Sequence, residues 1–217
     1  MEQNKRQKER ETLILAALLH DIGKIGQREE EYYAKHEELS NAFVRSLEDF
    51  LGGEFCRKVA NLVSKHHSSP LTKNEKILHI ADKLAAAERY QEERKYRLKS
   101  NEAALVSIFS RVELFSPSLS EKYYQPKILN IDRETLFPTS QNKVSPGSYN
   151  NLWESFVSIL NKLRRIKYRP CDFVTFYFIL KKLGTFIPSA TPWEEEKHAR
   201  TVPDVSLFDH SRLTCAI

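Results

Sequence analysis

The sequence predicts a mainly α domain with a small β-hairpin or extended insert. Over most of the 217 residues, apolar side chains recur at three- or four-residue spacing, which is typical of amphipathic helices. Glycine occurs only six times, so few positions interrupt these helical patterns. Alternation of apolar and polar residues, the pattern of a strand, is limited to short stretches such as 106–108 and 127–131, which lie among prolines.

The N-terminal third of the chain predicts three helices in succession. Residues 5–20 form the first, which becomes apolar on all sides toward its end and is therefore buried there. Gly23 and Gly26 follow and would stop it. The second and third helices cover residues 30–51 and 54–66.

A fourth helix is predicted over residues 73–98. Its inner, apolar stripe is expected to comprise Ile77, Ile80, Ala81, Leu84 and Ala85. Beyond the proline-containing insert, helical patterns resume over 149–168, 172–183 and 206–217.

Composition and charge exclude several classes of protein. The longest uninterrupted apolar run covers residues 13–19, far short of the roughly 20 residues that span a bilayer, so no membrane association is expected. No secretory signal is visible, and three widely spaced cysteines without a CxxC motif fit a reducing cytoplasm. The net charge of +5 permits a polyanionic partner without requiring one. The last residues continue an apolar pattern, so we expect a piece of a longer protein.

Histidine and aspartate residues gather near the ends and inner faces of the predicted helices. His20 directly precedes Asp21, and His66 directly precedes His67. Imidazole and carboxylate groups together suit divalent transition-metal ions, and a carboxylate can bridge two of them. A bound ion would lower the pKa of its water and neutralise a phosphate oxygen, so the pattern points to hydrolysis of phosphate esters.

The segment 18–24, Leu-Leu-His-Asp-Ile-Gly-Lys, resembles the signature of the HD superfamily of metal-dependent phosphohydrolases. In that all-helical family the ligands follow the order of a first His, a His-Asp pair, further His residues and a final Asp. The resemblance implies one or two divalent ions, with Mn²⁺, Ni²⁺ or Co²⁺ favoured over Mg²⁺, Fe²⁺ or Zn²⁺. The implied ligands are His20, Asp21, His36, His66, His67, Asp82 and His210, with either or both of the adjacent histidines contributing.

The order of these motifs departs from the family pattern, because no histidine precedes His20. The residues around His210, Phe-Asp-His-Ser-Arg-Leu, are similar to the family's first-motif helix. This implies a circularly permuted HD domain, as in the N-terminal part of the large, Palm-containing subunit of type III CRISPR interference complexes. Segments that resemble its Csm-type (III-A) version are 86–89, 106–111, 187–191 and 203–210.

This resemblance implies an organisation and a function. Residues 1–98 would form the HD core, 99–148 the extended insert and loop, and 149–217 the helices that complete the permuted domain. The implied activity is metal-dependent cleavage of single-stranded DNA, within a prokaryotic, cytoplasmic ribonucleoprotein that contains crRNA and other type III subunits. An HD phosphohydrolase of nucleotides or cyclic dinucleotides is an alternative, and a structural module without turnover is a third hypothesis.

Within the ligand set, His20 and Asp21, together with Lys24, are the candidate catalytic residues. Asp21 is expected to bridge two ions, and Lys24 to hold a scissile phosphate as a point charge. A lysine near a helix end often faces solvent instead, so both interpretations of Lys24 stay open. His79 fits a structural role better than a ligand role, and His198 fits an exposed loop.

Two basic segments interleave tyrosines with lysine and arginine, as do the stacking surfaces that bind single strands. Charge runs of this kind are also common on solvated helix faces. The candidate nucleic-acid contacts are Arg94, Lys95, Arg97, Arg164, Arg165 and Lys167.

Overall fold

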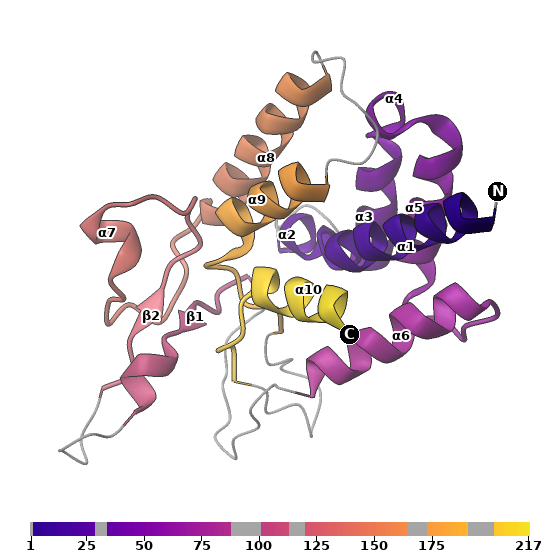
Figure 1. The fold of residues 1–217 in the computed structure, drawn as a ribbon. Helices are drawn as coiled ribbons and strands as arrows, with labels where there is room; N and C mark the ends of the chain where they lie inside the picture. The colour runs from indigo at the N-terminus through magenta and orange to yellow at the C-terminus, as the bar shows by residue number, and fades with distance from the viewer. Residues whose placement is uncertain (1, 29–33, 88–100, 113–119, 165–172, 191–201) are drawn as a thin grey trace.

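The computed structural model describes residues 2–28, 34–87, 101–112, 120–164, 173–190 and 202–217 (Figure 1). Helices make up most of these residues, which also contain one two-stranded sheet. The mainly α fold with a small β-hairpin is therefore confirmed. None of the described helices combines the length and apolar character needed to cross a membrane.

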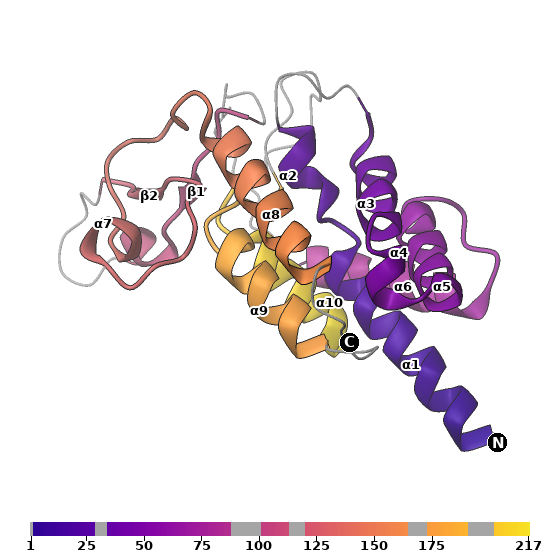
Figure 2. The same cartoon turned by 90° about the horizontal axis from the view of Figure 1, so that it is seen from above.

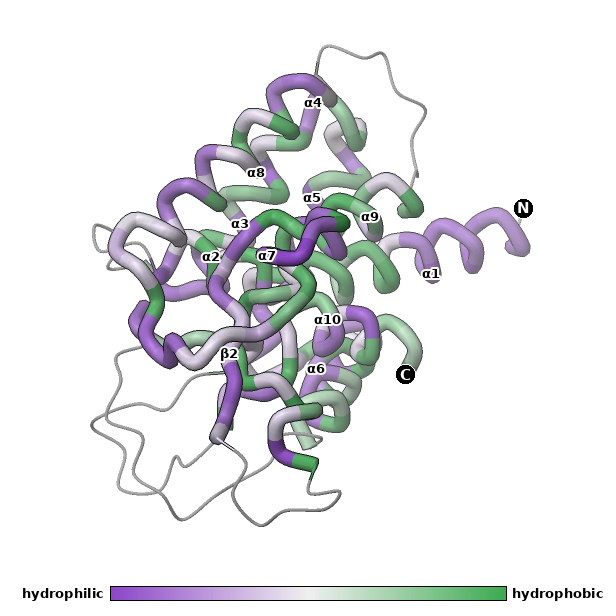
Figure 3. Tube along the Cα trace, turned by 90° about the vertical axis from the view of Figure 1, so that its left-hand side faces the viewer, coloured by the Kyte–Doolittle hydropathy of each residue, from purple (hydrophilic) through white to green (hydrophobic). Residues whose placement is uncertain are grey.

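Helix α1 (Glu2–Leu19) leads the chain into the core. Its first turns are hydrophilic and exposed and extend beyond the rest of the molecule, as Figure 2 and Figure 3 show. Its last turns, from Leu15 onward, are buried and pack against α5 (Gly53–Lys65) and α10 (Leu207–Ala216). The apolar end of α1 thus delivers the residues that follow it to the centre of the domain.

The glycines after α1 do not stop a helix, so that prediction is wrong. Gly23 and Gly26 lie inside the short helix α2 (Gly23–Gln27) and are buried. A Cβ atom on Gly23 would lie 2.2 Å from the carbonyl oxygen of His36 and 2.6 Å from the backbone nitrogen of Ser40. The glycine is needed because the first turn of α3 (His36–Arg45) approaches the backbone there.

The prediction of a single helix over residues 30–51 is also wrong, because α3 ends at Arg45 and α4 (Glu48–Leu51) begins after a turn. The Ser46 hydroxyl donates to the Phe43 carbonyl at 2.7 Å, and the Leu47 N–H donates to Val44 O at 3.0 Å. These hydrogen bonds join residues three positions apart, so they compete with the four-residue spacing that would continue the α-helix. Residues 29–33 lie outside the described residues, and the next predicted helix is confirmed as α5.

Helix α6 (Lys73–Ala86) presents a different face to the core from the one predicted. Ile77, Ile80 and Leu84 are exposed, which contradicts their place in the inner stripe. The buried residues of α6 are Glu75, Leu78, Ala81, Asp82 and Ala85. Helix α6 packs against α10 with the Asp82 carboxylate on its buried face. The three apolar side chains lie on its exposed face. Residues 88–98 of the predicted helix lie outside the described residues.

A capping box fixes the start of α6. The Thr72 hydroxyl accepts from the Glu75 N–H at 3.3 Å, and the Glu75 carboxylate accepts from the N–H groups of Leu71 and Thr72. These hydrogen bonds satisfy backbone N–H groups that the first turn of a helix leaves without a partner.

Substitution Thr72→Ala is expected to lower the free energy of unfolding by about 1 kcal/mol, because the Glu75 N–H loses its acceptor. Urea denaturation followed by circular dichroism measures the change. Thr72→Ser keeps the hydroxyl and should match the unchanged protein. An equal loss in both variants would show that the hydroxyl does not cap the helix.

The insert forms the hairpin at one side of the molecule. Strand β1 (Leu105–Val106) pairs antiparallel with β2 (Tyr123–Tyr124), and the 3-10 helix η1 (Ile108–Arg111) and helix α7 (Arg133–Leu136) flank it. The second strand is therefore not at 127–131 as predicted; there the Leu129 N–H donates to Lys182 O instead.

The C-terminal helices close the core. Helices α8 (Ser148–Arg164) and α9 (Phe173–Gly184) match the predicted segments within a few residues, apart from the predicted residues 165–168 and 172, which lie outside the described residues. Phe156 of α8 stacks on Phe43 with ring centroids 4.7 Å apart. Helix α10 packs against α1, α6 and α9, so the last helix lies beside the C-terminal half of the first (Figure 1).

Candidate metal centre

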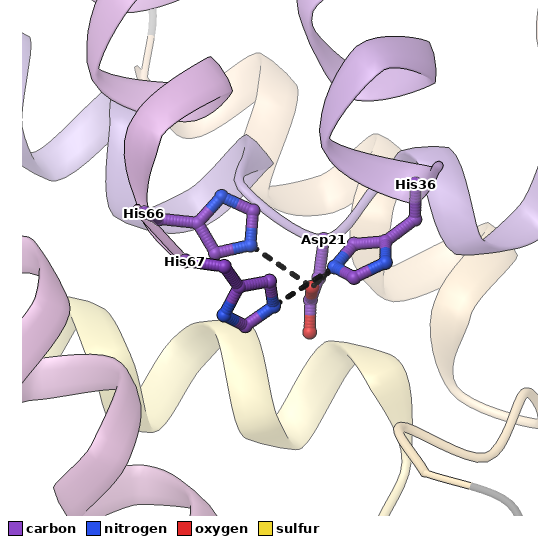
Figure 4. A group of neighbouring side chains, drawn as sticks. All are labelled: Asp21, His36, His66 and His67. Atoms are coloured by element: carbon purple, nitrogen blue, oxygen red, sulfur yellow. Dashed lines mark hydrogen bonds and ion pairs between the residues drawn. The ribbon is translucent and has the colours of Figure 1, made fainter. Parts of the chain in front are cut away.

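The structure brings together every predicted ligand. They come from the end of α1, the start of α3, the end of α5 and the buried faces of α6 and α10, and Figure 4 shows three of the histidines around the Asp21 carboxylate. The residues that converge are His20, Asp21, His36, His66, His67, Asp82 and His210.

One group of ligand atoms surrounds the Oδ1 atom of Asp21, and we call it the Oδ1 group. His36 Nε2 lies 3.3 Å and His66 Nε2 3.7 Å from this oxygen. His67 Nε2 lies 3.0 Å from His36 Nε2. One ligand atom from each of the four residues lies within 4.8 Å of the others, which is the spacing around a single ion.

A second group surrounds the Oδ2 atom of Asp21, and we call it the Oδ2 group. The Nε2 atoms of His20 and His210 each lie 3.5 Å from this oxygen. Asp82 adjoins the group, with its Oδ1 atom 3.0 Å from His210 Nε2 and 3.5 Å from His20 Nε2. The two groups thus share Asp21, one carboxylate oxygen serving each.

Bonds outside the ligand set orient the imidazole rings. The Nδ1 atom of His20 bonds to Ala17 O at 2.7 Å, and that of His66 bonds to Val63 O at 2.6 Å. A proton on Nδ1 leaves the Nε2 lone pair directed into the site. Glu37 plays the same part for His36, because its Oε2 atom lies 3.2 Å from His36 Nδ1. Glu37 is not predicted from the sequence, although its place directly after a candidate ligand is a usable signal.

The donor atoms fit a divalent cation. The Nε2 atoms of His20 and His66 and the Oδ1 atom of Asp21 are buried, and none makes a well-formed hydrogen bond with a described residue. Buried acceptors that face one another without a donor are costly unless a cation lies between them. Mixed imidazole and carboxylate donors suit Mn²⁺, Fe²⁺, Co²⁺, Ni²⁺ and Zn²⁺.

The two carboxylates are ionised at neutral pH. Burial alone would raise the pKa of Asp21, but the Lys24 ammonium and the His20 imidazole hold that pKa well below its usual range. Burial would likewise raise the pKa of Asp82, but the neighbouring His20 imidazole and the hydrogen bond with His210 hold that pKa well below its usual range. Each carboxylate therefore brings a full negative charge to the site.

The histidine pKa values respond to the same environment. Burial and the neighbouring His66 and His36 lower the pKa of His67 to about 4, so its ring is neutral and ready to bind a metal at neutral pH. Burial also lowers the pKa of His20, but the charges of Asp21 and Asp82 outweigh it and raise that pKa above its ordinary value. This raised pKa reflects the negative charge that the two carboxylates place around the ring.

Lys24 points into the site and does not face solvent. Its Nζ atom donates to Asp21 Oδ2 at 2.6 Å and to the carbonyl oxygen of Ser189 at 2.9 Å. Arg28 binds the neighbouring carbonyl of Pro188 at 2.6 Å. These contacts with the backbone carbonyls of Pro188 and Ser189 are not predicted from the sequence, because no local pattern signals a contact 165 residues away along the chain.

Of the other residues considered in the sequence, His79 has a structural contact, and most of the rest lie outside the described residues. His79 Nδ1 bonds to the carbonyl oxygen of His66 at 2.8 Å, so His79 contacts the end of α5. His198 and the basic candidates at 94, 95, 97, 165 and 167 lie outside the described residues. Arg164 is the last residue of α8, but its side chain is not among those described.

Comparison with known proteins relates the first part of the chain to a known domain family. Residues 1–87 match the model of the HD domain. The CRISPR system single-strand-specific deoxyribonuclease Cas10/Csm1 (subtype III-A) of Methanocaldococcus jannaschii is 29% identical over 94% of this chain and 27% of its own length. The same-named protein of Enterococcus italicus is also 29% identical, over 94% and 28%. The chain spans about a quarter of the length of these curated relatives.

Solved structures support the same fold. A crystal structure of the Csm1–Csm4 subcomplex of the type III-A CRISPR-Csm interference complex matches 96% of this chain and 27% of its own, with a TM-score of 0.62 and 24% identity. Csm1 in T. onnurineus gives a TM-score of 0.63 at 24% identity, again over 96% of this chain and 27% of its own. Residues 1–87 therefore match the HD domain family, and nearly the whole chain is similar in sequence to Cas10/Csm1 proteins of subtype III-A and in fold to Csm1.

Proposed function

We propose that this domain is a divalent-metal-dependent nuclease that cleaves single-stranded DNA. The observation that carries the proposal is the shared carboxylate: Asp21 offers one oxygen to each of two groups of imidazoles. The names of the relatives, single-strand-specific deoxyribonucleases, supply the substrate class. By the same likeness, the domain would work in a prokaryotic cytoplasm, inside a type III CRISPR ribonucleoprotein with crRNA and further subunits such as Csm4.

The two groups define which residues would hold ions. The Oδ1 group would hold one ion and the Oδ2 group a second, with Asp82 beside the second. When bound, such ions supply a water of lowered pKa and neutralise charge on a phosphate oxygen. Mn²⁺, Ni²⁺ or Co²⁺ is proposed because the donors mix imidazole nitrogen with carboxylate oxygen.

The protein contributes orientation and access. Bonds from Nδ1 to backbone carbonyls hold the His20 and His66 rings so that no rotation is needed when a ligand arrives. His67 is the most exposed member, with 44% of its side chain accessible, whereas the His20 and His210 side chains have none. A DNA phosphate would therefore approach from the side of His67 and His36. His20, Asp21 and Lys24 are the proposed catalytic residues, and the basic segments near 94–97 and 164–167 remain proposed DNA contacts.

Removal of divalent ions with EDTA is expected to abolish cleavage of a labelled single-stranded oligonucleotide, because the proposed ions supply the water of lowered pKa. Added Mn²⁺, Ni²⁺ or Co²⁺ should restore cleavage more effectively than Mg²⁺, which binds imidazole poorly. A gel assay measures both effects, with a duplex of the same sequence as the control.

The same assay separates the proposal from its rivals. Hydrolysis of nucleoside triphosphates or cyclic dinucleotides, with the oligonucleotide left intact, would place the domain among HD phosphohydrolases of small nucleotides. Metal binding without turnover of any of these substrates would contradict an enzymatic role and favour a structural module.

A further inference from the structure

Arg28, the residue that closes α2 one turn after Lys24, is a buried cation outside the set of metal ligands. It is only 5% exposed, and its guanidinium donates to the Pro188 carbonyl oxygen at 2.6 Å and to the Tyr149 hydroxyl at 3.4 Å. No carboxylate in the described part of the chain pairs with it. Burial raises the pKa of Tyr149, so that phenol is neutral and supplies no counter-charge. A permanently charged group is costly to bury without a counter-ion, and the short bond to Pro188 is its main compensation.

Pro188 belongs to a short segment, residues 187–189, which we call the strap. The strap pairs antiparallel with residues 205–207 through two backbone hydrogen bonds, from the Ser189 N–H to Val205 O at 2.8 Å and from the Leu207 N–H to Ile187 O at 2.7 Å. Pro188 faces Ser206 in this pairing. Because a strand pair this short is weakly fixed by its own hydrogen bonds, the Arg28 guanidinium provides a strong additional anchor.

The pairing of the strap continues directly into the helix that carries His210. Ser206 is the N-cap of α10, and its hydroxyl accepts from the Asp209 N–H at 3.0 Å. The His210 N–H donates to the Ser206 carbonyl oxygen at 3.0 Å, so the histidine lies in the first turn of the helix. The Nε2 atom of His210 lies 3.0 Å from Asp82 Oδ1 and 3.5 Å from Asp21 Oδ2. The position of the strap therefore affects where His210 enters the metal centre.

The strap also contacts the other side of the metal centre. The Ser189 carbonyl accepts from the Lys24 ammonium at 2.9 Å, and the same ammonium donates to Asp21 Oδ2 at 2.6 Å. Lys24 and Arg28 are four residues apart, so they lie on one side of α2 and hold two neighbouring carbonyls of the strap. The strap thus joins the helix that follows Asp21 to the helix that carries His210.

We infer that Arg28 is a positioning residue of the metal centre. It holds the strap against α2, and the strap in turn holds the first turn of α10, so that His210 reaches Asp21 and Asp82. Helix α10 comes from a distant part of the chain, so contacts across the fold must fix its place beside α1 and α6. This inference rests on the metal centre of the proposed function and adds a residue that assembles the centre before an ion binds.

Hydrogen exchange of the metal-free protein, followed by NMR at single amides, tests the anchor. Arg28→Met keeps a long side chain but removes the donor, so the Ser189 and Leu207 amides should exchange faster by about tenfold or more. Amides within α5 should exchange as before. Arg28→Lys keeps a charged donor and should restore most of the protection. Tyr149→Phe is the matched control, because it removes the weaker partner of the same guanidinium and leaves the bond to Pro188. Its strap amides should exchange as in the unchanged protein.

Calorimetric titration with Mn²⁺ tests the path from Arg28 to His210. Arg28→Met should lower the Mn²⁺ affinity by about tenfold, the scale of a lost outer contact around a metal ligand. In a His210→Gln background the same substitution should have no further effect, because the ligand that Arg28 positions is already absent. A residue with a general structural role would weaken binding equally in both backgrounds. Tyr149→Phe should bind Mn²⁺ like the unchanged protein.

The unchanged protein gives a test that does not require any variant to fold. In mild urea the strap amides and the Arg28 guanidinium protons should become exchangeable together. A guanidinium that stays protected after the strap opens would overturn the inference.

Three results with the variants would also overturn it. They are strap amides that Arg28→Met leaves unchanged, an equal change in Tyr149→Phe, and a loss of Mn²⁺ affinity that is the same without His210. None of these measurements is of cleavage. A protein that meets the expectations but cleaves no DNA refutes the proposed activity alone, and an active protein whose strap does not depend on Arg28 refutes this inference alone.

Discussion

Substitution of Asp21 by asparagine is expected to reduce metal-dependent cleavage of single-stranded DNA by about a thousandfold or more, since both proposed ions share this side chain. Asparagine has nearly the same shape, so the packing at the end of α1 should persist. Its single oxygen would stay with the Lys24 ammonium, the strongest donor nearby. Its NH₂ group would then face the Nε2 atoms of His36 and His66 and fill the place of a cation.

Initial cleavage rates and Mn²⁺ titration of this variant measure the effect, and affinity should fall most for the Oδ1 group. Asp209→Asn is the matched control, because Asp209 lies next to His210 but is half exposed and pairs with Arg212 at 3.1 Å. That control should cleave at the rate of the unchanged protein. Unimpaired cleavage by Asp21→Asn, with thermal unfolding as before, would refute the role of Asp21 as a shared ligand.

The ligand set could be predicted from the sequence because its members belong to short motifs at helix ends. The His20-Asp21 and His66-His67 pairs are adjacent in the chain, and the helices that end there were recognisable from their apolar periodicity. His210 lies 128 residues from Asp82, and only the likeness of its surroundings to a family motif placed it in the site. The packing of α10 against α1 and α6 explains how that distance is closed.

Other features could not be predicted, because they depend on what lies across the fold. Apolar periodicity placed Ile77, Ile80 and Leu84 inside, but it takes no account of a buried carboxylate that needs histidine partners. Asp82 lies on the buried face of α6 and pairs with His210, whereas the three apolar residues lie on the exposed face. The contact of Lys24 with Ser189 could not be predicted either, because no local sequence pattern indicates it.

Gly23 shows how a residue of a local motif is also required by a contact with another helix. From the sequence it is a helix stop, whereas in the structure it is the point where α2 and α3 approach. Its N–H donates to Ser40 Oγ at 2.8 Å, which ties the turn after Asp21 to α3. His36 is the first residue of α3, so the distance between Asp21 Oδ1 and His36 Nε2 depends on this approach. The glycine of the motif therefore sets the geometry of the Oδ1 group.

Substitution Gly23→Ala is accordingly expected to lower the free energy of unfolding by about 2–3 kcal/mol, the scale of an overpacked core. The added Cβ would lie 2.2 Å from the His36 carbonyl oxygen, and backbone atoms cannot move aside as a flexible side chain can. The start of α3 must shift, so Mn²⁺ binding should weaken in the same variant. Urea denaturation and calorimetric titration measure the two effects on one sample.

Gly26→Ala, one turn later in the same helix, is the matched control. Its Cβ would meet the Trp153 ring at 3.6 Å and Leu39 at 3.8 Å, which are ordinary contacts. Alanine favours helix over glycine by about 1 kcal/mol, so this variant should be as stable as the unchanged protein or slightly more so. Ser40→Ala removes only the hydrogen bond and should cost about 1 kcal/mol. If Gly23→Ala lost no more than Ser40→Ala and bound Mn²⁺ normally, the close approach of α3 would not control the site; a larger loss with weakened binding would tie the motif glycine directly to the metal centre.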